Sequence, residues 1–484
     1  MTGSVASGFV TAVDLGATSG RVMLAEVGAD RLEMRAVARF ANDPVTLWNG
    51  HRGALHWDIA GLYRNVCDGL AAAGHETDGL AGIGVCSWAV DYGLLRDGRL
   101  LSTPHHYRDE RTSHGVELVH AELGAEELYR RNGIQFLPFN TVYQLAAEKA
   151  DGLLDLADTV LLIPDLVNYW LTGTRAAERT NVSTTALLTL DGVWDSELMQ
   201  RLGLATALFP DLVEAGTVRG PLLPDVRARL GLPAGAEVVS VASHDTASAV
   251  AAIPMQSERA AYISCGTWGL VGVEIPGPVV SDAARAANFT NEVGTDGRIR
   301  FLHNVMGMWL LSETVRQFER EGLSVELASL LDQAGDMPAP AAVFDTDDPR
   351  FLPPGDMPAR IAQWYSEREL PAPVGPAAVV RAIVESLAAA FAAAVRTAGE
   401  LTGVEVSTVH IVGGGSQNEL LCQLTADRLG LPLLAGPVEA TALGNVLLTA
   451  RARGLLSGGL ETLRALVAKR FPVRRYEPRA VSVG

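Results

Sequence analysis

The sequence V-T-A-V-D-L-G-A-T-S-G-R-V-M-L-A-E-V, residues 10–27, carries the strongest fold signal in this 484-residue chain. Two β-prone apolar runs flank a turn of small residues, Gly16 to Gly20, which is the pattern of a β-hairpin. A second segment, Ala260 to Ile275, reads A-A-Y-I-S-C-G-T-W-G-L-V-G-V-E-I and predicts another strand, glycine turn and strand. One glycine turn only reverses a chain, but two hairpins that each open a long mixed segment indicate a duplicated architecture. We expect both turns to face one cleft, where backbone N–H groups can hold a polyphosphate.

The segments around these hairpins alternate between helix and strand patterns, as in an α/β protein. Ala60 to Ala73 and Thr141 to Ala150 have the apolar spacing of helices, and Val160 to Ile163 that of a short strand. An alanine-rich helix is expected over Ala377 to Leu401. The proline-rich interval Met337 to Gly375 predicts a surface excursion and not a domain boundary.

A glycine-rich turn follows a third strand near the end of the chain. A buried strand is expected over Thr408 to Val412, then Gly413-Gly414-Gly415, then a helix over Asn418 to Leu429. Glycine permits close approach of a ligand to the backbone, and a helix N-terminus favours an anion, so a nucleotide fits here. A tight strand-to-helix turn without a ligand is the alternative, and this segment alone fits both.

Composition restricts the classes of partner. With 48% hydrophobic and 20% charged residues, the chain can bury more than one core. Its 39 basic and 56 acidic residues give a net charge of -17, which repels phosphate backbones and anionic lipid. We therefore expect no nucleic-acid and no membrane partner.

Cysteine usage and the apolar segments predict a cytoplasmic protein. The four cysteines form no C-x-x-C pair, which is typical of a reducing compartment without structural zinc; they are Cys67, Cys86, Cys265 and Cys422. Met1 to Phe9 lacks the basic start and long apolar core of a signal peptide. The apolar run Ser386 to Val395 is bounded by charges and is shorter than the about 20 residues of a membrane span.

Two aspartates are placed for phosphate chemistry. Asp14 ends the first strand directly before a glycine turn, where its carboxylate can orient Mg²⁺ through water, although it can equally cap the turn. Asp245 lies in Ser243-His244-Asp245-Thr246, between an apolar run and a helix. It can accept the proton of an attacking hydroxyl, and a helix N-cap is the alternative.

Trp88 and Asp91, in C-S-W-A-V-D-Y, are a further candidate pair. An aromatic face beside a carboxylate suits the C–H surface and hydroxyls of a sugar, while a tryptophan buried in a core strand is the alternative. Arg21 and Arg108 are positive charges near these segments, and solvated or acid-paired arginines explain them as well.

Taken together and in order, a series of segments resembles the FGGY family of carbohydrate kinases. They are V-D-L-G-A-T-S-G-R (13–21), R-F-A-N (39–42), W-D-I (57–59), Y-R-D-E-R-T (107–112), Q-F-L-P-F-N-T-V-Y-Q-L (135–145), S-H-D-T-A-S-A-V (243–250), G-T-W (266–268), N-V-M-G-M-W-L-L (304–311), V-G-G-G-S-Q-N (412–418) and A-G-P-V-E-A-T-A-L-G-N (435–445). Within the family, the resemblance is to members that phosphorylate L-rhamnulose.

The resemblance implies a two-lobed actin-like ATPase (ribonuclease H-like) α/β fold with a duplicated core and an interlobe cleft. The expected divisions are residues 8–241, an N-terminal lobe with most of the sugar site; 242–455, a C-terminal lobe with most of the nucleotide site; and 456–484, a C-terminal extension. Closure of the cleft would exclude water and so prevent hydrolysis of ATP.

The resemblance also implies roles for single residues. Asp245 is the expected proton acceptor and, with Ala89, His244, Thr246 and Asn304, contacts the sugar. ATP is expected to contact Ala17, Thr18, Ser19, Gly20, Arg21, Thr267 and Gly414, and Asp14 is the expected Mg²⁺ residue.

Two positions depart from the pattern of these members. Where they usually read D-T-W-G-V-D, this chain has Cys86-Ser87-Trp88-Ala89-Val90-Asp91, and the methyl group of Ala89 can narrow the sugar pocket. A glutamine that often contacts ATP is replaced by Ser312, which puts a nucleotide contact there in doubt.

The implied reaction is phosphorylation of L-rhamnulose at its C1 hydroxyl by ATP, a step of L-rhamnose catabolism, in a monomer or homodimer. The alternatives are a kinase for another ketose such as L-fuculose or xylulose, a non-catalytic sugar-binding regulator on the same scaffold, and an actin-like ATPase that acts on proteins.

Overall fold

The computed structural model describes residues 7–323 and 326–479, so the opening residues Met1 to Ala6 and the last five positions of the expected extension, 480–484, lie outside the described residues. The chain divides into two compact units, each built from several segments. Unit 1 comprises Met1–Pro254, Ile275–Phe301 and Ala440–Arg470, and unit 2 comprises Met255–Glu274, Leu302–Glu439 and Phe471–Gly484.

The central sheet of unit 1 has the order β12 (Thr217–Pro221), β13 (Glu237–Ser240), β6 (Leu80–Ser87), β1 (Gly8–Leu15), β2 (Ser19–Gly28) and β3 (Arg31–Ala41). β1 is antiparallel to β2 and parallel to β6, and β6 is parallel to β13. Parallel strands end at the same edge of a sheet, so the residues that follow β1, β6 and β13 come together.

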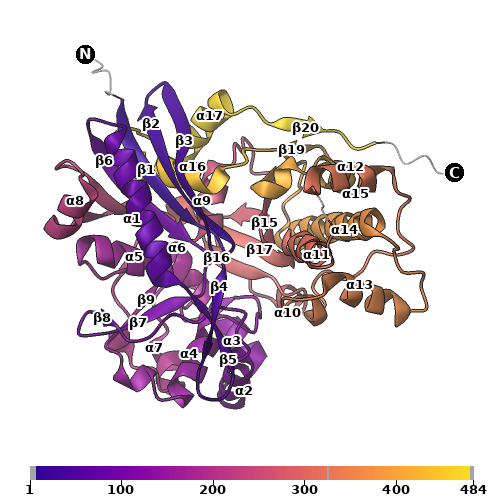
Figure 1. Cartoon of the computed structure of the whole chain (residues 1–484), viewed down its shortest axis with the longest axis horizontal. Coiled ribbons are helices and arrows are strands. Elements are labelled where there is room, and N and C mark those ends of the chain that lie inside the picture. The colour runs from indigo at the N-terminus through magenta and orange to yellow at the C-terminus, as the bar shows by residue number, and fades with distance from the viewer. Residues whose placement is uncertain (1–6, 324–325, 480–484) are drawn as a thin grey trace. The chain divides into compact units, whose positions relative to one another are not determined.

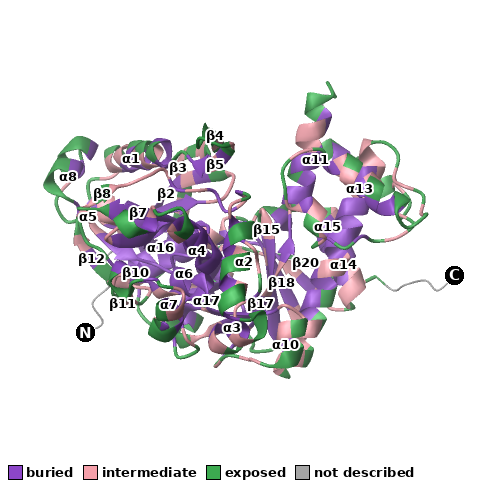
Figure 2. Cartoon of the chain, turned by 90° about the horizontal axis from the view of Figure 1, so that it is seen from below, coloured by how far each residue is buried: buried purple, intermediate pink, exposed green. Residues whose placement is uncertain are grey.

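Helices cover both faces of this sheet. α1 (Ile59–His75) packs against β2 and β3, and α16 (Ala440–Ala452) packs against β1, β6 and α9 (Asp245–Ala252). Figures 1 and 2 show α1 and α16 on opposite faces. Asn445 of α16 is fully buried and donates from Nδ2 to the carbonyl oxygen of Val13, 3.2 Å away. This hydrogen bond joins α16, which comes late in the sequence, to β1.

The rest of unit 1 adds small sheets and short helices. The strands of the small sheets are β4 (Pro44–Trp48), β5 (Gly53–Trp57), β7 (Tyr92–Arg96), β8 (Arg99–Leu100), β9 (Thr159–Leu162), β10 (Ala177–Glu178) and β11 (Leu212–Val213). Helices are α2 (Thr112–Glu122), α3 (Ala125–Asn132), α4 (Thr141–Ala150), η1 (Leu154–Leu156), α5 (Ile163–Thr172), α6 (Arg179–Val182), η2 (Ser183–Thr185), α7 (Ser196–Arg201), η3 (Thr206–Leu208), α8 (Pro224–Leu230), α10 (Asp282–Ala286), η4 (Thr295–Gly297) and α17 (Leu460–Arg470). A second core lies under α2 and α4, around Val119, Val142 and Leu145.

Unit 2 contains its own mixed sheet. The strands of this sheet follow the order β16 (Thr290–Val293), β17 (Ile299–Met306), β15 (Trp268–Ile275), β14 (Ala260–Cys265), β18 (Thr408–Val412), β19 (Leu433–Ala435) and β20 (Arg474–Tyr476). β16 and the start of β17, up to Phe301, belong to unit 1. Its helices are α11 (Trp309–Arg320), α12 (Leu327–Asp336), η5 (Pro349–Phe351), α13 (Met357–Ser366), α14 (Pro376–Thr402), η6 (Gly414–Gln417) and α15 (Glu419–Leu429). β14 pairs antiparallel with β15 and parallel with β18.

The sequence located both hairpins, the helices α1, α4 and α14, and the strands β9 and β18. One interpretation needs correction. The interval Met337 to Gly375 is more than a surface excursion, because it contains α13 and fully buries Phe351, Ile361 and Tyr365. The helix expected over Asn418 to Leu429 is α15, which Asn418 caps by accepting from Leu421 N at 3.0 Å, and η6 lies between the triple glycine and this helix.

The apolar segment around Ser386 to Val395 is also longer than the sequence interpretation assumed. It forms part of α14, a 27-residue helix that is long and apolar enough to cross a membrane by length and composition. However, 72% of its most apolar window is buried within the protein, and such burial is typical of a core helix. Its buried residues are visible in Figure 2.

Candidate functional site

Two residues of the segment 39–42 contact the first glycine turn, one at each end of the turn. Within the turn, Gly16 N donates to Ser19 O at 2.9 Å, and Asn42 donates from Nδ2 to Gly16 O at 2.7 Å. The ring of Phe40 packs so closely on Gly20 that a Cβ there would overlap it. The resulting turn is short and fixed, and its residues Ala17, Thr18 and Ser19 are at least partly exposed.

Asp14 lies next to the end of β1 and faces β2. The hairpin register places it opposite Arg21, whose Nε is 2.9 Å from Asp14 Oδ2. The aspartate is almost completely buried, with 1% of its surface exposed. The Asp14 carboxylate therefore forms an ion pair with Arg21 across the hairpin, a contact that the turn-capping interpretation does not include.

The segment Ser243 to Thr246 lies at the same edge of the unit 1 sheet as Asp14. Ser87 N, at the end of β6, donates to Ser243 O at 2.9 Å, and Trp88 N donates to Leu15 O at 3.0 Å. The buried carboxylate of Glu178 accepts from Ser243 N at 2.9 Å and Ser243 Oγ at 2.7 Å. The chain is thereby fixed immediately before Asp245.

Asp245 is the first residue of α9, and His244 occupies the cap position. The N-cap alternative for Asp245 is therefore wrong, because the helix begins one residue earlier than that interpretation requires. Thr246 Oγ1 donates to Asp245 Oδ1 at 3.1 Å, and 29% of the aspartate side chain is exposed. Burial of the carboxylate raises the pKa of Asp245 above its ordinary value of 3.8. A raised pKa makes this carboxylate a better proton acceptor.

A buried pair behind His244 was not predicted from the sequence. Glu292 on β16 lies 3.3 Å from His244 Nδ1, and Arg300 at the start of β17 lies 3.0 Å from the same Glu292 oxygen. Arg300 has no exposed surface. The segment T-N-E at 290–292 has no motif spacing relative to residue 244, so only the folded chain reveals this contact.

Trp88 and Asp91 belong to a buried aromatic cluster, which supports the core interpretation of the tryptophan. Trp88 packs on Trp57 with ring centroids 4.0 Å apart and is 4% exposed. The Asp91 carboxylate accepts from Trp57 Nε1 (2.6 Å), Trp88 Nε1 (3.0 Å), Tyr107 N (3.2 Å) and Gln144 Nε2 (2.8 Å). Burial raises the pKa of Asp91 to about 6. Ala89, in the turn after Trp88, remains partly exposed.

Unit 2 brings Thr267 and Gly414 to one edge of its sheet. Thr267 lies in the turn between β14 and β15, and Gly414 begins η6 after β18, which runs parallel to β14. The Gly266–Thr267 turn accepts hydrogen bonds from Met308 N at 3.0 Å and Trp309 N at 3.2 Å. Gly414 is exposed and faces open space, since a Cβ there would meet nothing within 4 Å.

Asn304 lies on β17 in unit 2, and neighbouring residues of this strand are held by Asp347. Asp347 Oδ1 accepts from Met306 N at 3.0 Å, and its Oδ2 lies 2.9 Å from His303 Nε2. Ser312, the second position that departs from the pattern, lies in α11.

The candidate residues thus form two groups, one in each unit. Unit 1 brings together Asp14, Ala17, Thr18, Ser19, Gly20, Arg21, Ala89, His244, Asp245 and Thr246, while unit 2 contains Thr267, Asn304 and Gly414. Among the described residues there is no cluster of three or more His, Cys, Asp or Glu side chains that could hold a metal ion alone.

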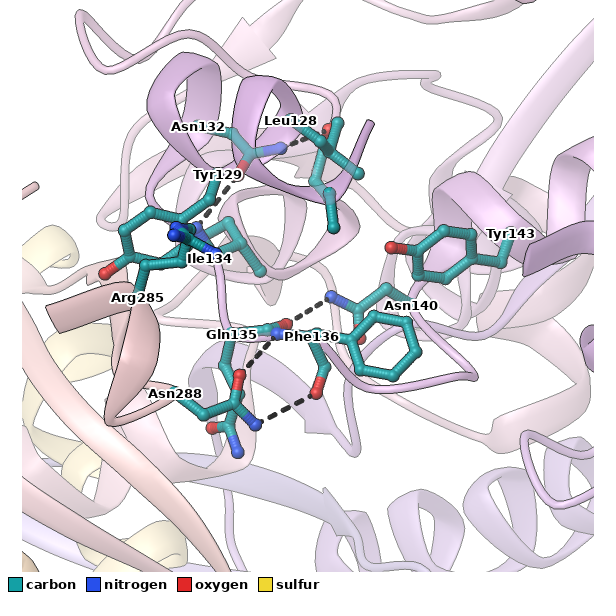
Figure 3. A pocket seen from close by; sticks show the side chains of 12 residues that line it. Leu128, Tyr129, Asn132, Ile134, Gln135, Phe136, Asn140, Tyr143, Arg285 and Asn288 are labelled. Carbon is teal, nitrogen blue, oxygen red and sulfur yellow. Dashed lines mark hydrogen bonds between the residues drawn. The ribbon is translucent and has the colours of Figure 1, made fainter. Parts of the chain in front are cut away.

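A cavity of about 240 Å³ lies in unit 1 beside the segment 135–145. Figure 3 shows its lining, in which Asn288 Nδ2 donates to Phe136 O at 3.2 Å and Phe136 N donates to Asn288 Oδ1 at 2.9 Å. Tyr129 Oη and Asn140 Oδ1 line it as buried polar atoms without a protein hydrogen bond. Buried water commonly satisfies such atoms, so the cavity has the character of a hydrated space.

Comparison with known proteins gives a consistent result over nearly the whole chain. The N-terminal domain model of the FGGY family of carbohydrate kinases matches residues 9–252, and the C-terminal domain model matches residues 261–453. A rhamnulokinase of Pectobacterium carotovorum subsp. carotovorum (strain PC1) is 42% identical over 98% of this chain and 94% of its own length. A rhamnulokinase of Bacteroides thetaiotaomicron is 37% identical over 96% of this chain and 95% of its own length.

Solved structures show the same fold at low sequence identity. A ligand-bound xylulose kinase from Lactobacillus acidophilus has a TM-score of 0.77 at 18% identity and covers 97% of this chain and 94% of its own. Glycerol kinase from Plasmodium falciparum with ADP has a TM-score of 0.74 at 14% identity over 97% and 94%. The α/β architecture is therefore the two-domain, actin-like ATPase fold of sugar kinases, as expected from the sequence.

Proposed function

The chain belongs to the FGGY family of carbohydrate kinases, and from this premise we propose that it transfers the terminal phosphoryl group of ATP to the C1 hydroxyl of L-rhamnulose. The products are ADP and L-rhamnulose 1-phosphate. The substrate assignment is supported by similarity to rhamnulokinases over nearly the full length. One structural observation carries the chemical assignment: Asp245, with its raised pKa, lies at the same carboxyl edge of the unit 1 sheet as Asp14.

In this proposal, Asp245 accepts the proton of the C1 hydroxyl as its oxygen attacks the terminal phosphorus of ATP. The bond from that phosphorus to the bridging oxygen of ADP breaks in line with the attack. The side chain of Asp245 is partly exposed, so a substrate can reach its carboxylate. The position of Asp245 at the start of α9 orients that carboxylate.

The nucleotide contacts are proposed in both units. Backbone N–H groups of the turn formed by Ala17 to Gly20, with Arg21, would bind phosphate oxygens, and Thr267 and Gly414 would contact the nucleotide. Open space at Gly414 supports a close approach of ligand to its backbone.

Asp14 is the proposed Mg²⁺ residue. Magnesium is commonly held by one or two carboxylates together with substrate phosphates, and a single buried carboxylate at the phosphate turn fits that donor chemistry. When bound, Mg²⁺ neutralises charge on the transferring phosphoryl group. Arg21 orients the carboxylate through its 2.9 Å contact.

The sugar would be held by Ala89, His244, Thr246 and Asn304 in addition to Asp245. We propose the divisions 8–241, 242–455 and 456–484, and the named sugar contacts lie in the first two, with Ala89 in 8–241 and the others in 242–455. A cytoplasmic location fits the four free, buried cysteines. We also propose a monomer or homodimer without nucleic-acid or membrane partners, in keeping with the net charge of -17.

A panel of ketoses with coupled detection of ADP tests the proposal. We expect the highest kcat/KM with L-rhamnulose and negligible ADP formation without sugar. Higher kcat/KM with L-fuculose or xylulose would assign another ketose, an outcome that the Ala89 departure makes worth testing. Sugar binding without ADP formation would indicate a regulator, and sugar-independent hydrolysis would indicate an ATPase that acts on proteins.

A further inference from the structure

The imidazole of His244 contacts charged groups through both ring nitrogens. Arg300 Nη2 lies within hydrogen-bond distance of Nδ1, at 3.1 Å, and Asp245 Oδ1 lies 3.4 Å from Nε2. The histidine is 5% exposed. Its polar atoms are therefore directed at neighbouring side chains.

The donor chemistry of arginine decides where the imidazole proton lies. Glu292 Oε2 also lies 3.3 Å from Nδ1, but the contact with hydrogen-bond geometry at this nitrogen is that of Arg300 Nη2. A guanidinium has only donors and stays charged in proteins, so this hydrogen bond requires Nδ1 to be unprotonated. The proton of the neutral ring then lies on Nε2, which faces Asp245. Glu292 lies 3.0 Å from Arg300 Nη2 and balances its charge, and Arg300 also donates from Nε to Val293 O at 3.3 Å.

We propose that Glu292 and Arg300 are positioning residues that hold His244 with its Nε2–H directed at Oδ1 of Asp245. Thr246 Oγ1 donates to the same oxygen at 3.1 Å. With Oδ1 accepting from Thr246 and facing His244 Nε2 at 3.4 Å, Oδ2 is the oxygen that receives the substrate proton. His244 then acts through Asp245, which refines its role as a sugar contact. This inference rests on the proposed function, because it assumes that Asp245 is the proton acceptor.

Charge on the proposed positioning residues also acts on Asp245 electrostatically. The positive charge of Arg300 lowers the pKa of Asp245 against the larger opposing effect of burial. The titratable and charged groups that face this site come from several elements; they are Asp14, Arg21, Cys86, Glu178, His244, Glu292 and Arg300.

Two single variants give opposite expectations. Arg300→Met removes a positive charge and should move the acid limb of the kcat/KM profile to higher pH, whereas Glu292→Gln removes a negative charge and should move it to lower pH. Both should lower kcat by about 10-fold to 100-fold, because the acceptor is displaced. The KM for the ketose should stay within about threefold, since neither residue is assigned a contact with the sugar.

Additional variants separate positioning from loss of structure. Removing one partner of a buried ion pair can unfold a protein, so Glu292→Leu combined with Arg300→Met replaces both charges and should fold. This double variant should keep the reduced kcat. Arg131→Met is the control. Arg131 donates two hydrogen bonds, of 2.7 and 2.8 Å, to the buried carboxylate of Asp195, and neither residue belongs to this site. It should lower Tm without changing kcat or the pH profile.

Introducing Arg300→Met into the Asp245→Asn variant separates the positioning role of Arg300 from the proton-acceptor role of Asp245. We expect no further loss of turnover, because the acceptor that Arg300 positions is already absent. An undiminished further loss, an unchanged pH profile, or a rise in KM larger than the fall in kcat would overturn the positioning role. Near-normal turnover of Asp245→Asn alone would instead overturn the proposed function.

Discussion

A Cβ atom placed on Gly413 would lie 2.8 Å from the carbonyl oxygen of Cys265. Gly413 also has a φ of +80°, a conformation that favours glycine. The next residue, Gly414, has neither constraint, since it lies in open space without a positive φ. Two adjacent glycines in one turn therefore serve different needs.

Gly413→Ala and Gly414→Ala should separate folding from nucleotide binding. Gly413→Ala should reduce the free energy of unfolding by about 1–3 kcal/mol, because strain and the close backbone contact cannot be relieved cheaply. Gly414→Ala should keep Tm and raise the KM for ATP. Denaturation curves and ATP titrations of both variants check this pair, and equal effects on Tm would contradict it.

Asp245→Asn should raise Tm near pH 7. Burial raises the pKa of Asp245 in the folded chain, so the folded state binds its proton more tightly than the unfolded state does. Stability conferred by this group is therefore present at low pH and is lost as pH rises from the unfolded pKa through the folded one. A neutral amide avoids that loss. Thermal unfolding at pH 4 and pH 7 measures the effect, and a lower Tm at pH 7 would count against the burial argument.

The acid limb of the kcat/KM profile should lie above the ordinary aspartate pKa of 3.8, because the carboxylate of Asp245 must be ionised to accept a proton. Initial rates in constant-ionic-strength buffers measure the limb. An acid limb that persists unchanged in the residual activity of Asp245→Asn would assign it to another group.

Trp57→Phe should lower the free energy of unfolding by about 1–3 kcal/mol, because it removes the indole N–H that donates to the buried carboxylate of Asp91 at 2.6 Å. Trp48→Phe is the matched control, because Trp48 is 74% exposed on the β4–β5 hairpin. Urea denaturation should show a shift for Trp57→Phe alone. Equal shifts would show that the Asp91 contact contributes little.

Ala89→Gly should change the ratio of kcat/KM between L-rhamnulose and xylulose by about tenfold in favour of L-rhamnulose. One methyl group in a pocket is worth about 10-fold to 200-fold in discrimination. The ketose panel repeated on this variant provides the measurement. An unchanged ratio would place Ala89 outside the sugar pocket.

Local patterns allowed much of the fold to be predicted. β1, β2, β14 and β15 were visible because apolar runs flank short glycine turns, and their pairing is antiparallel as hairpins require. The helix α13 was missed because prolines such as Pro349 and Pro354 dominate its surroundings. Pro358 is compatible with α13 because it falls in the first turn, where a missing N–H costs no hydrogen bond.

Site residues could be proposed from the sequence only where a contiguous motif marks them. Asp14 lies near the end of β1 and Asp245 follows β13, and both strands run parallel to β6, so topology brings the two segments to one edge of the sheet. The contact of Arg300 and Glu292 with His244 joins positions more than 40 residues apart in sequence, and nothing local marks it. The hydrogen bonds that the buried carboxylate of Asp91 accepts likewise come from Trp57 and Gln144, which only folding brings to it.

Steady-state turnover of Asp245→Asn with L-rhamnulose and ATP tests the central claim most directly. We predict a fall in kcat of about 10³-fold or more, with a ketose KM within a few-fold of the unmodified chain. Retention of most of the turnover by a correctly folded variant would contradict the assignment of Asp245 as the proton acceptor.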